Sequence, residues 1–398
     1  MKSLKVMQLT SFEGNIGDVF YSEPFPDLIS EALKTDVEIT RAHIRDFYLN
    51  SRKRNFDAEF LHKINCHDLF VVGGGQYFDV RWDYSHTGTT LNMSDGFIEG
   101  IKVPVVLNGL GYTEPYDVKE NNAVQKQIFK KFERFISNVS KRDNWLLTVR
   151  NDGSIERIAN RFGQGFAALL HETPDVGFYF DKDIIPYEFE EKLPTVGFSI
   201  GNDTFTDDVT AKNKTRHLND GVAKIIQALI SKGMRVVFFL HMPRDIDAVH
   251  QIMQRVGVEG FRKNVVIAPY NTSGFTAAKT IVSYYKACDI VIAMRFHANV
   301  IALQNSIPSI GLVLDGIVSG ERIAALYDKL QMGCYVLQVD ETDLNFAERL
   351  QGMLAHVLSD RSKCILLEKA AMKKIIMQRR EYCTTVRSFY NRQNNAEK

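Results

Sequence analysis

The 398-residue sequence lacks the features that define several classes of protein. No apolar segment of secretory length follows Met1, and no run approaches the ~18 apolar residues that span a bilayer. The five cysteines are scattered without a CxxC pair, which predicts free thiols and neither a disulfide framework nor a zinc site. The 49 Lys and Arg residues balance 48 Asp and Glu residues, so no basic excess indicates nucleic-acid binding. We therefore expect a cytoplasmic protein that binds neither metal nor nucleic acid.

The sequence does contain a regular alternation of short apolar runs and longer amphipathic stretches. Many of the runs are rich in Val and Ile, which is typical of strands buried on both faces. Helical patterns separate them, and repeated βα units of this kind predict parallel sheets with right-handed crossovers. The expected strands are Lys5–Leu9, Val37–Arg41, Asp68–Val72, Val103–Asn108, Leu146–Arg150, Thr195–Ile200, Arg235–His241, Asn264–Ala268, Asp289–Met294, Ser309–Val313 and Cys334–Val339.

The strands form two series, which predicts an α/β protein of two Rossmann-like domains facing a cleft. Between the series, Phe180–Pro194 is charged, contains two prolines and shows no clear period, as expected of a linker. We expect domains at 1–185 and 186–360. Residues 361–398 predict a long helix with a polar tail, carrying ten Lys and Arg against three Glu. We favour a helix packed back across the domains with a solvated basic face, and the alternative is contact with an anionic membrane surface.

Ligands bind beyond the carboxyl ends of strands in open parallel sheets, and the sharpest pattern of the second half lies there. The run Asp289–Met294 leads into Arg295-Phe296-His297, and a helix is expected to follow. The arginine offers a permanent charge, and the histidine can move protons near neutral pH. Burying both without an anionic partner would be costly, so we favour a binding site over core packing.

Two more positions of the second half follow expected strands. His241 ends one of them and should open onto the same face as His297, either as a helper in proton transfer or as a cap. Asp315 follows the run Ile310–Leu314 and is either a cleft carboxylate or a helix cap.

Three loops of the first half also follow expected strands. Residues 14–18, Gly-Asn-Ile-Gly-Asp, form either a tight turn with a cap or part of a site. The glycines at 73–75 leave bare amides that can cradle an anion, or they form only a sharp, tightly packed turn. Arg150 offers a planar fork for a carboxylate or phosphate, or it forms a surface salt bridge. Ser154 would cap the helix that follows.

Taken in order, these motifs resemble the polysaccharide pyruvyl transferase family, from about Gly14 to about Asp328. The segment at 150–154 departs from the family, which usually has Arg-Asp or Arg-Glu where this chain has Arg150-Asn151-Asp152. Members have folds similar to two-domain GT-B glycosyltransferases. They attach the pyruvyl group of phosphoenolpyruvate to a sugar, typically as a ketal on two hydroxyls. The matching motifs are Gly-Asn-Ile-Gly-Asp at 14–18, Gly-Gly-Gly at 73–75, Gly-Leu-Gly at 109–111, Arg-Asn-Asp-Gly-Ser at 150–154, Pro-Asp at 174–175 and Arg-Phe-His-Ala at 295–298.

The resemblance implies a transferase with phosphoenolpyruvate as donor substrate and no cofactor. His297 would be the general acid and base, helped by His241, while Arg150 and Arg295 would hold the carboxylate and phosphate. The first-half loops and Asp18 would face a saccharide acceptor from a cell-surface polysaccharide or glycoconjugate precursor. Whether that acceptor is lipid-linked, and the protein therefore at the inner membrane surface, is left open. The other candidate substrate-binding residues are Asn15, Gly74, Gly75, Ser154 and Asp315.

Two rival functions stay open. A GT-B glycosyltransferase that uses a nucleotide sugar usually has a glutamate at the ribose, and Glu321 could serve. A non-catalytic member of the family would keep the fold alone, and the presence of Arg150, Arg295 and His297 together argues against it.

Overall fold

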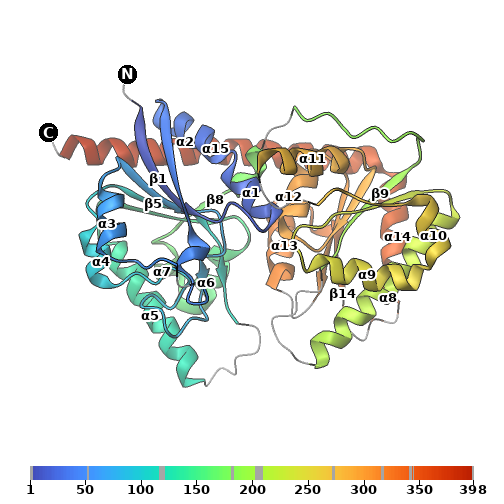
Figure 1. Ribbon diagram of the computed structural model, residues 1–398, viewed down its shortest axis with the longest axis horizontal. Coiled ribbons are helices and arrows are strands. Elements are labelled where there is room, and N and C mark those ends of the chain that lie inside the picture. Colours follow the sequence, from blue (N-terminus) through green and yellow to red (C-terminus); the bar gives the residue numbers. More distant parts are fainter. Residues whose placement is uncertain are drawn as a thin grey trace. The chain divides into compact units, whose positions relative to one another are not determined.

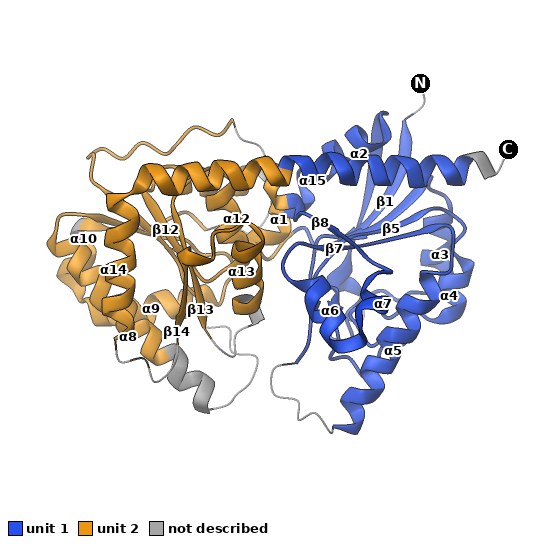
Figure 2. Cartoon of the chain, turned by 180° about the vertical axis from the view of Figure 1, so that it is seen from behind, with its two compact units in different colours: residues 1–12, 21–176, 376–398 blue, residues 13–20, 177–375 orange. Residues whose placement is uncertain are grey.

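The computed structural model divides into two compact units, each built on a six-stranded parallel sheet (Figures 1 and 2). The first unit contains residues 1–12, 21–176 and 376–398, and the second contains 13–20 and 177–375. The expected α/β fold with two Rossmann-like halves is confirmed. The structure describes residues 3–51, 53–115, 122–180, 183–201, 209–270, 274–314, 318–339, 343 and 345–396.

The sheet of the first unit has the order β2-β1-β3-β5-β7-β8. Every residue of β3, β5 and β7 is buried, because helices cover both faces of the sheet. The strands are β1 (Leu4–Thr10), β2 (Val37–His43), β3 (Leu69–Gly73), β5 (Val105–Leu110), β7 (Trp145–Arg150) and β8 (His171–Thr173), beside a small pair of β4 (Phe78–Asp79) and β6 (Tyr112–Thr113). The helices are α2 (Phe25–Leu33), η1 (Ile44–Phe47), α3 (Ala58–Asn65), α4 (Asp95–Gly100), α5 (Ala123–Val139), α6 (Ser154–Phe162) and α7 (Gln164–Ala167).

The sheet of the second unit has the order β11-β10-β9-β12-β13-β14, and two separate apolar clusters form its core. The strands are β9 (Thr195–Ser199), β10 (Arg235–Phe238), β11 (Val265–Ile267), β12 (Ile290–Ala293), β13 (Ser309–Leu314) and β14 (Val336–Val339). The helices are η2 (Val176–Tyr179), which begins at the boundary between the units, α8 (Val209–Ser231), α9 (Asp245–Val256), α10 (Val258–Asn264), α11 (Phe275–Lys286), α12 (Phe296–Gln304), α13 (Val318–Lys329), η3 (Gly333–Tyr335) and α14 (Phe346–Ser359).

A short N-terminal segment belongs to the second unit. Helix α1 (Ile16–Ser22) begins in this segment, and Ile16, Val19 and Phe20 are fully buried in one of the two apolar clusters of the second unit. The same cluster contains Phe239, just after β10, and Ala298 of α12. Hydrophobic burial therefore holds residues 13–20 against the elements that carry His241 and His297.

The C-terminal residues form one long helix, α15 (Arg361–Ala396), as expected from the sequence. Its residues up to Ile375 belong to the second unit, and those from Ile376 onward belong to the first (Figure 2). The sequence suggested a boundary near 185 and a separate segment from 361, whereas the compact units divide between 176 and 177 and share α15. Among the described residues, no helix is both long and apolar enough to cross a bilayer.

A buried carboxyl group on α15 makes the stability of the second unit dependent on pH. Glu368 is fully buried, and its Oε1 accepts a hydrogen bond of 3.4 Å from the Ser309 hydroxyl. The hydroxyls of Ser309 and Tyr327 lie 2.8 Å apart, and the Tyr327 hydroxyl donates to Asn299 Oδ1 over 2.9 Å. Burial raises the pKa of Glu368 to about 8. The folded protein therefore keeps a proton that the unfolded chain loses nearer its ordinary pKa of 4.5.

We expect the free energy of unfolding to fall as pH rises from about 4.5 to about 8, by up to ~1.4 kcal/mol per pH unit from this group. Glu368→Gln should flatten that slope, because the amide is neutral at every pH. Urea unfolding at pH 5, 6.5 and 8 would measure it. The same pH slope in the variant and the wild type would contradict the assignment.

Candidate active site

The turn between β12 and α12 presents Arg295 and His297 at the carboxyl end of the second unit's sheet. Arg295 is extended (φ −85°, ψ 132°), and the helix begins at the next residue. The Asn299 side chain donates from Nδ2 to the carbonyl of Arg295 over 2.9 Å and to that of Ala293 over 3.2 Å. Helix α12 is buried along almost its whole length, but His297 in its first turn is only half-buried. The turn is therefore fixed from within, and its histidine is partly exposed although the Nε2 atom of the ring is buried.

A buried carboxylate orients the guanidinium of Arg295. Asp245 is fully buried, and its two oxygens pair with Nη2 and, over 3.3 Å, with Nε of Arg295. The second of these oxygens also accepts the backbone N–H groups of His241 and Met242, over 2.8 and 3.2 Å. A Cβ atom on Gly201 would overlap the guanidinium, so the glycine after β9 lets Arg295 lie against the backbone. This two-point pairing fixes the plane of the fork.

His241 belongs to the same site, but its side chain is buried. Its Nε2 is 2.7 Å from the hydroxyl of Tyr285, whose ring stacks on Phe239 at 3.7 Å between centroids. Burial, and then the charges of Arg295 and His297, hold the pKa of His241 well below its usual value. The imidazole of His241 is therefore neutral near pH 7. A neutral ring bound to a tyrosine is suited to positioning its neighbours.

The segment 13–20 lies directly against His297. The Ile16 N–H donates to the carbonyl of His241 over 2.9 Å. The Asn15 side chain accepts from the Gly17 N–H over 2.9 Å, which shapes the turn into α1. A Cβ atom on Gly17 would overlap the imidazole of His297. Asp18 lies half-buried in the first turn of α1, one residue beyond this contact. The expected motif 14–18 is thus part of the second unit and shapes the surroundings of its histidine.

Arg150 is also held by carboxylates, in the first unit. Its side chain is 2% exposed, with Nε 2.5 Å from Asp152 and Nη1 3.5 Å from Asp175. Asp152 also accepts hydrogen bonds from the backbone N–H and the hydroxyl of Ser154. Asp152 stands one position later than the carboxylate of the family pattern, and it therefore still pairs with Arg150. The result is a buried ion network, where the sequence suggested an anion site or a surface salt bridge.

Tyrosine packing accounts for the glycines at 73–75. A Cβ atom at Gly73 would overlap the hydroxyl of Tyr21, and one at Gly74, where φ is +94°, would overlap its ring. A Cβ atom at Gly75 would overlap the ring of Tyr77. The Tyr21 hydroxyl also donates to the Asn108 carbonyl over 3.1 Å. Close packing is therefore sufficient to require glycine here, and an anion cradle stays a prediction.

The structure sorts the predicted residues into two groups. Asn15, Asp18, His241, Arg295 and His297 come together in the second unit, whereas Gly74, Gly75, Arg150 and Ser154 lie at the carboxyl edge of the first unit's sheet. Asp315 lies outside the described residues. Sequence reasoning missed Asp245, Gly201 and Tyr285 as parts of the site, whereas Gly17 lies within the motif 14–18 that it proposed.

The side chains that come together in the second unit can bind an anion and transfer a proton. Arg295 supplies a fixed cationic fork, the first amides of α12 add a positive end of a helix dipole, and His297 is the half-exposed titratable group beside them. In the part of the chain that the structure describes, no three His, Cys, Asp or Glu side chains gather as metal ligands would.

Comparisons with known proteins agree with this fold and these motifs. A family model described as Polysaccharide pyruvyl transferase matches residues 15–316. No curated protein matches the chain in sequence. Among solved structures, Anabaena Alr3699/HepE, in complex with UDP and glucose, has a TM-score of 0.54 at 12% identity, covering 97% of this chain and 100% of that one. A putative UDP-N-acetylglucosamine 2-epimerase from Listeria monocytogenes has a TM-score of 0.52 at 10% identity, covering 94% and 95%. These likenesses show a GT-B-like fold.

Proposed function

Because the chain belongs to the polysaccharide pyruvyl transferase family, we propose that it moves the pyruvyl group of phosphoenolpyruvate onto two hydroxyls of a saccharide. The observation that carries the proposal is that Arg295 and His297 both lie at the start of α12, with the motif 14–18 packed on the imidazole. The donor is a small molecule with a phosphate and a carboxylate, and such groups suit a guanidinium fork and helix amides.

The proposed reaction needs one proton donor that later accepts a proton. His297 protonates C3 of phosphoenolpyruvate, which makes C2 electrophilic, and one sugar hydroxyl adds to C2 and gives its proton back to His297. A second hydroxyl then displaces inorganic phosphate from C2 and closes the ketal, and its proton leaves with the phosphate. His297 serves as general acid and base, while Arg295 stabilises the charge that develops on the departing phosphate. Asp245 positions Arg295 and is itself held by the backbone N–H of His241.

A thermal-shift series on the full-length protein tests this function against its rivals. Phosphoenolpyruvate should raise the melting temperature, because a ligand that binds only the folded state stabilises it. A response to UDP or to a UDP-sugar alone would favour the glycosyltransferase alternative, for which Glu321 lies exposed in the first turn of α13. An unchanged melting temperature with all of these ligands would favour a non-catalytic protein.

Arg295→Lys should weaken phosphoenolpyruvate binding by about tenfold to a hundredfold. An ammonium cannot reproduce the planar fork, and it cannot pair with both oxygens of Asp245 as Arg295 does. Isothermal titration measures the affinity, and Arg262→Lys on exposed α10 is the matched control. Unchanged affinity in the Arg295 variant would remove this residue from the donor site.

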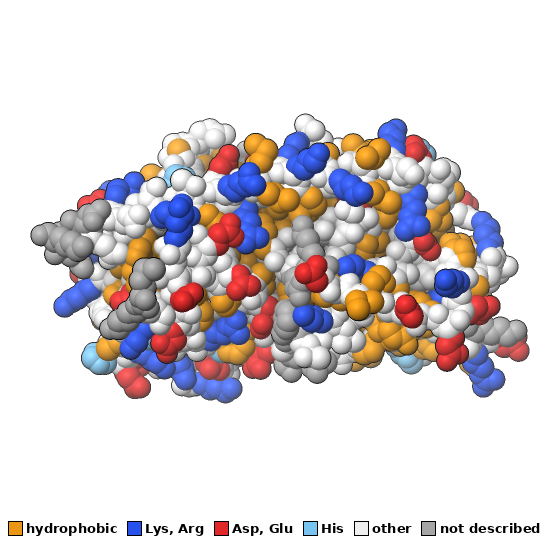
Figure 3. Space-filling model, turned by 90° about the horizontal axis from the view of Figure 1, so that it is seen from above, with side chains coloured by type: hydrophobic (Ala, Val, Ile, Leu, Met, Phe, Trp, Pro, Cys, Tyr) orange, Lys and Arg blue, Asp and Glu red, His pale blue; other side chains and the backbone are white. Residues whose placement is uncertain are grey.

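We also propose that α15 contacts an anionic membrane surface, where a lipid-linked acceptor would lie. Three of the exposed large apolar side chains of the described residues are on this helix: Leu366 (66% exposed), Ile376 (40%) and Met377 (61%). Leu366, Lys373, Met377 and Arg380 follow a spacing of seven, four and three residues, which places them on one helix face. Figure 3 shows a side of the molecule on which Lys and Arg side chains are interspersed with hydrophobic and with Asp and Glu side chains. A basic face with apolar side chains is typical of interfacial helices.

Vesicle sedimentation would measure this contact. Wild-type protein should bind vesicles that contain anionic phosphatidylglycerol and should not bind neutral phosphatidylcholine vesicles, and added salt should release it. Lys373→Gln combined with Met377→Gln should reduce binding, whereas Lys130→Gln with Lys141→Gln should not, since these exposed lysines belong to other segments of the chain than α15. Equal binding by both double variants would contradict the proposal.

A further inference from the structure

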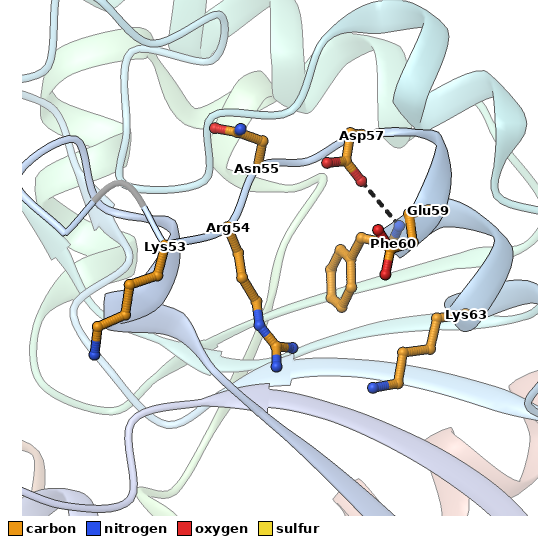
Figure 4. Close-up of a pocket in the computed structure, with 7 residues that line it drawn as sticks. All are labelled: Lys53, Arg54, Asn55, Asp57, Glu59, Phe60 and Lys63. Atoms are coloured by element: carbon orange, nitrogen blue, oxygen red, sulfur yellow. Dashed lines mark hydrogen bonds between the residues drawn. The ribbon is translucent and has the colours of Figure 1, made fainter.

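A cavity apart from the site described above lies in the first unit, beyond the carboxyl end of β2. It has a volume of about 290 Å³. The loop after η1 and the first two turns of α3 form its walls, with the buried ring of Phe60 beside it (Figure 4). It therefore occupies the edge of a parallel sheet where ligands of this kind of fold bind. The lining residues are Lys53, Arg54, Asn55, Asp57, Glu59, Phe60 and Lys63.

Three cations and the two carboxylates of Asp57 and Glu59 line this cavity, and two of the cations are in no ion pair of the described residues. Lys53 pairs with Asp46 over 3.5 Å. Among the residues that the structure describes, no carboxylate forms an ion pair with Arg54 or Lys63. The Asp57 carboxylate is engaged as the cap of α3, accepting from the Phe60 N–H over 3.0 Å. Figure 4 shows Arg54 and Lys63 extending toward the same side of the cavity, away from this carboxylate.

We propose that this cavity binds a phosphoryl or carboxylate group carried by the saccharide acceptor. A guanidinium fork and an ammonium that reach the same space are the groups that recognise these anions. The volume is at the small end of the range for ligand pockets, so it suits one anionic group with part of a sugar. The assignment to the acceptor rests on the proposed transferase function, whereas anion binding by Arg54 and Lys63 does not.

Titration with inorganic phosphate tests the cavity directly, in Arg295→Ala protein so that the donor site does not contribute. The Arg295→Ala protein should bind phosphate, and adding Arg54→Gln and Lys63→Gln should weaken the affinity by about tenfold or more. Adding Lys130→Gln and Lys141→Gln makes the same charge change at exposed positions elsewhere on the first unit and should leave the affinity unchanged. A parallel titration with glucuronate distinguishes the two anions: tighter phosphate binding identifies a phosphoryl group, and tighter glucuronate binding identifies a uronic acid.

The outcomes separate this inference from the function. If the Arg295→Ala protein binds neither anion, or if both double variants lose binding equally, the cavity is no anion site. If wild-type protein fails to bind phosphoenolpyruvate while the Arg54 and Lys63 dependence holds, the cavity stands and the proposed donor fails. Melting temperatures of all variants show whether a loss of binding reflects unfolding.

Discussion

His297→Ala is expected to lose turnover by about a hundredfold to ten-thousandfold while it keeps the wild-type fold and its affinity for phosphoenolpyruvate. The imidazole is half-buried at the first turn of α12, and the helix behind it is buried and held by Asn299. Removing the ring therefore deletes a proton donor and little of the core. Neutral His241, bound to Tyr285, cannot replace it, because its pKa lies well below the usual value.

The control for this variant is His250→Ala, which removes an exposed imidazole from α9 of the same unit. Phosphate release in the presence of acceptor gives the rate, and a melting curve gives the stability. Titration with phosphoenolpyruvate shows whether the donor still binds. Turnover near the wild-type rate in a folded His297→Ala protein would remove His297 from the chemistry.

Gly17→Ala is expected to reduce turnover by about a hundredfold although it replaces no charged or titratable residue. The added methyl would overlap the imidazole of His297, so the ring must move to another rotamer. The residue lies in α1 and does not have a positive φ, so the backbone accepts alanine, which favours a helix. The loss should therefore come from the displaced imidazole and not from unfolding.

Gly352→Ala is the matched control, because a methyl at this position on α14 meets no atom within 4 Å. It should leave the rate unchanged and stabilise the protein by up to about 1 kcal/mol through helix propensity. Separate values of kcat and KM are informative, because a displaced general acid and base lowers kcat more than it weakens donor binding. A Gly17→Ala protein that is as active as the Gly352→Ala protein would contradict the placement of motif 14–18 beside His297.

The parallel sheets could be predicted from the sequence because their strands are buried on both faces and stand out as apolar runs. All eleven expected strands are present, with ends shifted by up to three residues. Strand β8 was missed because it has only three residues, His171–Thr173, and begins with two polar ones at a sheet edge. Its presence is still consequential, because the chain after β8 brings Asp175 to Arg150.

The partners of the predicted residues could not be found in the same way. The Asp245–Arg295 pair joins positions 50 residues apart. In the sequence, Asp245 is only an acidic residue a few positions after an expected strand. Gly201 lies two residues after β9, which is a weak signal for a close approach of another group. The transfer of 13–20 to the second unit depends on the burial of Ile16, Val19 and Phe20, and an apolar pattern does not say which core it enters.

Isothermal titration of phosphoenolpyruvate into the wild-type protein and into Arg295→Ala tests the central claim most directly. The account predicts a binding event at this turn that the wild type shows and that the variant loses, because the guanidinium held by Asp245 lies at the start of α12. Binding that persists at full affinity in Arg295→Ala would place the donor elsewhere. The turn between β12 and α12 would then not be the donor site.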